Sequence, residues 1–215
     1  MVRLPKLSDQ CALLAWSAVL CTLGFGLLPG CEAQKPARSG FLDNYWQLTP
    51  NPEMDGALQY QNPTKQLDQY GRFMIDPIVV HFARQDQQTA LDPAKLTKLT
   101  AFFRDHLVKS LFKRYRVVDQ AGPGVLRLRI AITDIQKTDP INLLPQAKLL
   151  GLGLGGASME AEALDSQSGE RVTAVVESRP GDRISLAGLG EFDHAKLVIK
   201  YWIDRFVRRL DEAHG

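Results

Sequence analysis

Cysteine is scarce in this chain of 215 residues: there are three, and all lie within the first 31 positions, at Cys11, Cys21 and Cys31. A disulfide within residues 32–215 is therefore excluded, and so is a zinc site built on paired cysteines. Because no covalent cross-link is available, the folded part of the chain must be stabilised by burial of apolar side chains.

An excess of charge is also lacking, since 26 Lys and Arg residues face 24 Asp and Glu residues, a formal net charge of +2. This balance implies no nucleic-acid partner and no polybasic membrane surface. Histidine is sparse as well, and none of the four shows the His-x-x-x-His spacing of a metal site: His81, His106, His194 and His214. The sequence therefore predicts no metal ligand.

One long apolar run is present, and it spans the 18 residues from Cys11 to Leu28. Arg3 and Lys6 precede the run, and the small residue Gly30 precedes Cys31. This order is typical of a bacterial lipoprotein signal, in which the enzymes require a small residue before the cut and a thiol after it. The predicted cleavage motif is Leu28, Pro29 and Gly30. An uncut membrane anchor remains the alternative, because about 18 apolar residues is the lower limit for a span.

The composition divides the chain into three predicted parts. Residues 1–30 form the signal peptide, residues 31–70 a lipidated, Pro-rich tether, and residues 71–215 a single domain. Within the tether we expect an apolar cluster to dock on the domain, consisting of Phe41, Leu42, Tyr45, Trp46 and Leu48.

Hydrophobic periodicity predicts an α+β fold for residues 71–215, with a mixed, mainly antiparallel sheet of about five strands and two amphipathic helices on one face. Asp92 and Pro93 are typical of a helix start, while Pro77 favours an edge or bulged strand. The predicted strands are 73–82, 115–118, 125–135, 157–165 and 171–179, and the predicted helices are 92–114 and 191–210.

Residues 138–156 break this periodicity with glycines and prolines among many leucines. We expect a mobile apolar loop that forms the main contact surface, because exposed apolar patches mark contacts with partners or membranes. Its candidate contact residues are Leu143, Leu144, Leu149, Leu150, Leu152 and Leu154. Gly151, Gly153 and Gly156 fit a dinucleotide-binding spacing only weakly, because a strand is predicted to follow them where that motif requires a helix.

The sequence predicts no catalytic residue. His106 lies at the edge of a helix stripe, and a hydrogen-bonded core histidine is the favoured interpretation. Glu160 and Glu162 lie on one face of a strand, and solvated side chains explain them better than an acid–base pair. The serines at 158, 166 and 168 lack a nucleophile motif.

Several short motifs between Ser39 and the last helix form a recognisable set. The motifs are Ser39-Gly40-Phe41-Leu42, Tyr45, Leu48, Ile75-Asp76-Pro77, Gly122-Pro123-Gly124-Val125-Leu126, Ala131-Ile132-Thr133-Asp134, Gly155-Gly156-Ala157, Glu160, Asp165-Ser166 and Gly169-Glu170-Arg171. Together they resemble the bacterial lipoprotein family called domain of unknown function 3313. The resemblance implies an envelope lipoprotein of a Gram-negative bacterium without an assigned biochemical role.

The sequence thus favours a non-enzymatic binding or accessory module of an envelope complex, with a protein or lipid partner. We expect no cofactor other than a covalent diacylglyceryl and N-acyl lipid on Cys31. Glu32 rather than Asp follows that cysteine, which favours the outer membrane, with the domain facing the periplasm. Two alternatives stay open: a hydrolase-like envelope enzyme, and a carrier of a small ligand or lipid in a groove between helices and sheet.

Overall fold

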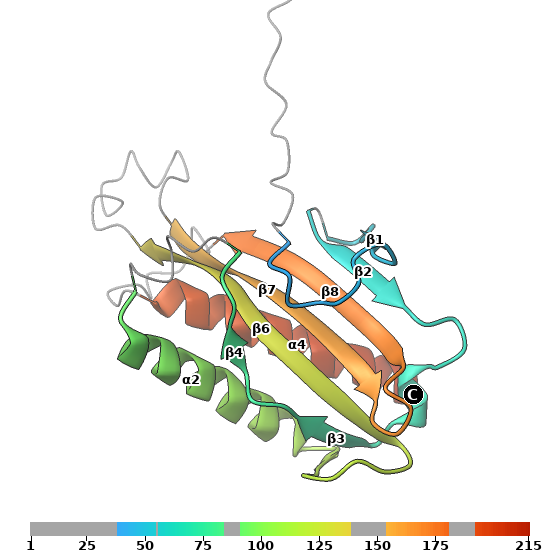
Figure 1. Ribbon diagram of the computed structural model, residues 1–215. Coiled ribbons are helices and arrows are strands. Elements are labelled where there is room, and N and C mark those ends of the chain that lie inside the picture. Colours follow the sequence, from blue (N-terminus) through green and yellow to red (C-terminus); the bar gives the residue numbers. More distant parts are fainter. Residues whose placement is uncertain (1–37, 55, 84–90, 139–153, 181–191) are drawn as a thin grey trace, which may run out of the picture. The chain divides into compact units, whose positions relative to one another are not determined.

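The computed structural model describes residues 38–215 except 55, 84–90, 139–153 and 181–191. All described residues lie in the second of two compact units, Ala33–Gly215. The fold is α+β, as predicted, with a mixed, mainly antiparallel sheet and two helices against one of its faces (Figure 1). The sheet has eight strands instead of about five.

The eight strands follow the order β1-β2-β8-β7-β6-β3-β5, and β4 also pairs with β6. Strands β3 and β4 run parallel to β6, and β5 runs parallel to β3, whereas all other pairs are antiparallel. The strands are β1 (Thr49–Pro50), β2 (Leu58–Gln61), β3 (Arg72–Ile75), β4 (Val79–Val80), β5 (Arg116–Val117), β6 (Val125–Thr138), β7 (Leu154–Asp165) and β8 (Arg171–Pro180). The helices are α2 (Pro93–Leu111), α4 (Asp193–His214) and the short 3-10 helix η1 (Leu67–Gln69).

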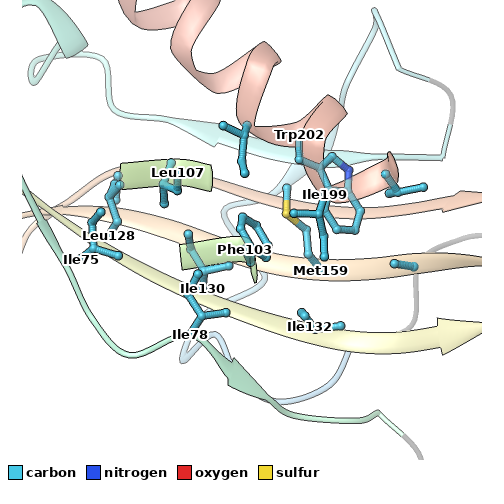
Figure 2. Close-up of a cluster of buried hydrophobic side chains, with 14 of the residues drawn as sticks. Ile75, Ile78, Phe103, Leu107, Leu128, Ile130, Ile132, Met159, Ile199 and Trp202 are labelled. Carbon is cyan, nitrogen blue, oxygen red and sulfur yellow. The ribbon is translucent and has the colours of Figure 1, made fainter. Parts of the chain in front are cut away.

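The core lies between the sheet and the two helices. Alternate residues of β6 point into it, and so do the apolar stripes of α2 and α4. Phe103 of α2 stacks on Trp202 of α4 with 6.4 Å between ring centroids. Figure 2 shows these two rings beside Ile130 of β6 and Met159 of β7. The helices are thus held to the sheet by apolar contact.

The predicted strand at 73–82 is divided at Pro77 into β3 and β4. Proline has no backbone N–H for a ladder hydrogen bond, so the strand pairing is interrupted there. Ile78 next to it nevertheless stays in the core, 8% exposed. Both halves pair with β6, so Pro77 interrupts the strand while β3 and β4 both remain in the sheet.

Both helices form close to the predicted positions. The Asp92 side chain accepts a hydrogen bond of 2.9 Å from the Ala94 N–H and caps α2, which ends at Leu111 rather than Arg114. Helix α4 continues to His214, beyond the predicted Leu210. Neither described helix is long and apolar enough to cross a membrane.

The boundary predicted at residue 71 is wrong, because part of the predicted tether belongs to the sheet. All four residues of β2 pair with β8, from Leu58 opposite Val176 to Gln61 opposite Thr173. The composition around β2 is rich in Pro, Asn and Gln and therefore resembles a linker, while its pairing partner is more than 100 residues away in the sequence. Sequence reasoning had no local signal for that pairing.

Candidate functional site

Residues 38–48, which we call the N-terminal strap, cross the face of the sheet opposite the helices (Figure 1). Leu42 is 2% exposed and packs on Ala174 and Val176 of β8. Three further strap residues pack at the edge of this small cluster: Phe41, Tyr45 and Leu48. The apolar cluster predicted in the tether thus docks on the sheet, except for Trp46, which is 81% exposed.

A buried carboxylate on β7 fixes the start of the strap. Glu160 is fully buried, and its Oε1 accepts a hydrogen bond of 2.6 Å from the Ser39 N–H. Its Oε2 accepts bonds from the Tyr45 hydroxyl at 2.5 Å and from the Leu42 N–H at 3.3 Å. We call these three contacts the Glu160 latch. Hydrogen bonds to an ionised acceptor are stronger than neutral ones, so the latch offsets the desolvation of the carboxylate.

The local backbone explains how three donors reach one side chain. Gly40 has φ +91°, a left-handed conformation that favours glycine and turns the strap sharply. The Tyr45 hydroxyl accepts from the Gly40 N–H at 2.8 Å while it donates to Glu160. Burial, together with the hydrogen bond to Glu160 and its charge, raises the pKa of Tyr45, so the phenol remains a donor at neutral pH.

A second buried carboxylate lies two residues along the same face. Glu162 is 4% exposed and is ion-paired with both Arg129 of β6 and Arg171 of β8, the latter at 2.7 Å. Arg171 also donates a 2.7 Å hydrogen bond to the Asn44 carbonyl of the strap. The Arg129 guanidinium lies 5.2 Å from the centroid of the Phe41 ring. Charged side chains of three strands thus reach the strap.

Glu160 and Glu162 share one face of β7, as predicted, but the expectation that they are solvated is wrong. Alternation along a strand identifies the shared face and does not reveal what covers it. Since donors occupy the oxygens of both carboxylates, the pair is unsuited to transfer protons. Arg129, Arg171 and Tyr45 were not recognised as part of this site. A usable signal was present, because Arg127 and Arg129 alternate on β6 while Glu160 and Glu162 alternate on its partner β7.

The other sequence candidates do not join this site. His106 lies on α2 with its Nδ1 3.2 Å from the Phe102 carbonyl oxygen, as a structural histidine would. Ser158 hydrogen-bonds Ser178 at 2.8 Å, and Ser166 bonds the backbone of Gly122. In the described part of the chain, no three His, Cys, Asp or Glu side chains are grouped as metal ligands.

The expected loop at 138–156 is shorter than predicted, because Thr138 pairs with Leu154 and Gln136 with Gly156 in the β6–β7 ladder. Gly156 therefore belongs to a strand and does not open a helix, which removes the dinucleotide-binding interpretation. Of the candidate contact leucines, Leu154 lies in β7 and the other five lie outside the described residues. Their role as a contact surface stays a prediction, and so do the roles of Cys31 and the cleavage motif.

The model of the family described as "Protein of unknown function (DUF3313)" matches residues 37–206, most of the chain. The chain belongs to this family. The matched range begins at the strap and ends in α4, so it includes the Glu160 latch and both paired arginines. A search of the curated proteins finds no match.

Several solved structures are similar to this chain at low identity, and three of them illustrate the range. A single-substitution PelC dodecamer from Paraburkholderia phytofirmans has a TM-score of 0.43 at 13% identity, covering 72% of this chain and 95% of that one. A Xanthomonas campestris protein of family DUF330 has a TM-score of 0.35 at 11% identity, covering 70% and 86%. A proposed neuraminyllactose-binding hemagglutinin homolog from Helicobacter pylori has a TM-score of 0.37 at 10% identity, covering 72% and 89%.

Proposed function

We propose that this protein is a lipid-anchored lipoprotein of the bacterial envelope that works as a non-enzymatic binding or accessory module. The sequence supports the anchor, because an apolar run ends in Leu28, Pro29 and Gly30 directly before Cys31. The lipid on Cys31 then holds the domain at the outer membrane on the periplasmic side.

The observation that carries this proposal is the Glu160 latch. Ser39, which the latch holds against the sheet, is eight positions after Cys31. A chain extends by at most about 3.3–3.6 Å per residue, so the first fixed point of the domain lies within roughly 30 Å of the lipidated cysteine. The domain therefore meets partners close to the membrane surface and not at the end of a long flexible tether.

The same contacts favour binding over catalysis. Glu160 and Glu162 were the carboxylate pair considered for acid–base chemistry, and their oxygens are occupied by backbone, phenol and guanidinium donors. The hydrolase-like alternative therefore loses its main candidate residues. A partner from the envelope, protein or lipid, fits a near-neutral domain better than a nucleic acid does.

Palmitate labelling of the full chain in a Gram-negative host tests the anchor. We expect label in the wild type and in Cys21→Ser, which alters a cysteine ten positions earlier, and none in Cys31→Ser. Label that persists in Cys31→Ser contradicts the proposal. Density-gradient fractionation then tests the location, and recovery mainly with inner-membrane markers overturns the outer-membrane assignment.

Insertion of residues tests the role of the latch. A flexible ten-residue insertion between Cys31 and Ser39 lets the domain move away from the membrane, whereas the same insertion in the exposed turn at Gln167 leaves the spacing unchanged. If a membrane-proximal position matters, crosslinking to envelope partners falls only with the first insertion. Equal crosslinking by both variants refutes that role.

A further inference from the structure

Two adjoining cavities lie at the end of the core where α4, η1 and β8 meet. The inner cavity has a volume of about 100 Å³ and the outer one about 270 Å³. They share three lining residues, Leu67, Thr173 and Arg209. Together they reach the lower end of the range of small-molecule sites, roughly 300–1,000 Å³.

The inner cavity is lined mainly by apolar side chains of the two helices and the sheet. Figure 2 shows several of these residues converging between the helices and the sheet. The helix side chains include Phe103, Leu107, Trp202 and Phe206, and those from the sheet include Ile130 and Met159. An apolar cavity half as large again, about 150 Å³, stays dry and binds benzene, so the inner cavity suits a short aliphatic group and not a whole lipid chain.

The outer cavity is polar, and Arg209 lies where the two cavities meet. Its lining includes the exposed carboxylates Asp68 and Glu212. Neither is within ion-pair distance of Arg209, and among the described residues this guanidinium has no hydrogen-bonding or ionic partner. By contrast, Arg205, one helical turn earlier, is paired with the buried Glu177 at 2.7 Å. Arg209 is thus a cation at the entrance of an apolar cavity with its donors unused.

We propose that this pair of cavities binds a small anionic amphiphile, whose short apolar group enters the inner cavity and whose carboxylate or phosphate head meets Arg209. The planar guanidinium can hold either head group through two parallel hydrogen bonds. Thr173 lines both cavities, but its hydroxyl already donates to the Tyr60 carbonyl at 2.8 Å, so Arg209 is the donor that meets the head. This site goes beyond the proposed anchoring role, since it lies on the helix side of the sheet and shares no residue with the Glu160 latch.

The test uses Trp202, which lines the inner cavity, as the reporter. The chain has three tryptophans, so a Trp16→Phe and Trp46→Phe background leaves Trp202 as the single one. The full chain is reconstituted in lipid nanodiscs and titrated with hexanoate, hexyl phosphate and hexanol. We expect saturable fluorescence changes with hexanoate or hexyl phosphate at concentrations at least tenfold lower than with hexanol.

Paired variants locate the site. Arg209→Gln removes the entrance cation and should weaken binding of the anionic probe at least tenfold, whereas the exposed neighbour Arg208→Gln should leave it unchanged. Ala161→Leu fills part of the inner cavity and should abolish binding of every probe. Circular dichroism and thermal unfolding check that each variant is folded.

Two results overturn this site. One is the absence of saturable binding by either anion. The other is an equal response of the Arg209 and Arg208 variants, which shows that the anion binds elsewhere. Both leave palmitate labelling at Cys31 untouched, so failure of the ligand site and failure of the anchor are distinguishable.

Discussion

The two faces of the sheet are covered in different ways. On one face, α2 and α4 bury a broad apolar surface that is held by contacts between apolar side chains. On the other, the strap buries only Leu42, Ala174 and Val176 fully, and charged groups set its position. Apolar burial is non-directional, whereas hydrogen bonds to a buried carboxylate require defined geometry. Packing on the helix face therefore contributes most of the free energy of unfolding, and contacts on the strap face determine where the chain enters the domain.

The largest expected effect is on the helix face. Phe103→Ala or Trp202→Ala leaves a cavity between the helices and the sheet and should lower the free energy of unfolding by about 3–5 kcal/mol. Urea unfolding followed by far-UV circular dichroism measures it. Phe112→Ala is the control, since that ring is 72% exposed and its loss should cost less than about 0.5 kcal/mol. A small effect at both core positions would show that apolar burial is not the main stabilising term there.

Loss of the latch should release the strap while the helices stay folded. Glu160→Gln removes the charge and one acceptor from the latch, and we expect a cost of roughly 2–3 kcal/mol because buried N–H donors lose their partner. Residues 38–48 should become protease-sensitive before the helices unfold. Glu170→Gln, with its side chain 49% exposed, is the control. If the strap and the helices of Glu160→Gln unfold together, the contrast between the two faces is refuted.

Acid should weaken the β7–β8 turn selectively. The Ser168 backbone N–H, aided by hydrogen bonds from Lys65 and Tyr70, holds the pKa of Asp165 well below its usual range. A lowered folded-state pKa means that this stabilisation is complete above the unfolded value, about pH 4, and is lost as the pH falls toward the folded value. Asp165→Asn removes the charge and keeps one acceptor oxygen, so it should cost about 1–2 kcal/mol at pH 7 as a weakened hydrogen-bond set, and it should reduce the pH dependence of unfolding below pH 4. An unchanged acid slope contradicts this assignment.

The smallest expected effect isolates one hydrogen bond of the latch. Tyr45→Phe keeps the ring and removes the hydroxyl that donates to Glu160, at a cost of about 1 kcal/mol. Trp46→Phe in the same strap should change stability by less than about 0.5 kcal/mol, since that side chain is exposed. Equal effects of the two variants, measured by urea unfolding, would mean that the hydroxyl contributes nothing to the latch.

The same contrast explains what the sequence could predict. Helix α2 was predictable from Asp92 and the spacing of its leucines, and β6 from strict alternation, because those signals are local. The latch depends on Ser39 and Glu160, which are separated by 121 positions. No local sequence pattern near either residue indicates that the two are in contact. Glutamate usually prefers solvent. The rule that places charged residues outside and apolar ones inside therefore works for the core but fails for Glu160 and Glu162.

The outermost strands of the described sheet, β1 and β5, are two residues long, and β1 contains a proline that lacks a backbone donor. Such short edges offer little template for association with another chain. Strand β8, by contrast, has ten residues and is shielded on its outer side by β2. A chain trimmed to begin after Gln61 would turn β8 into a long open edge. Proteolytic loss of the first 61 residues should therefore promote self-association through β8.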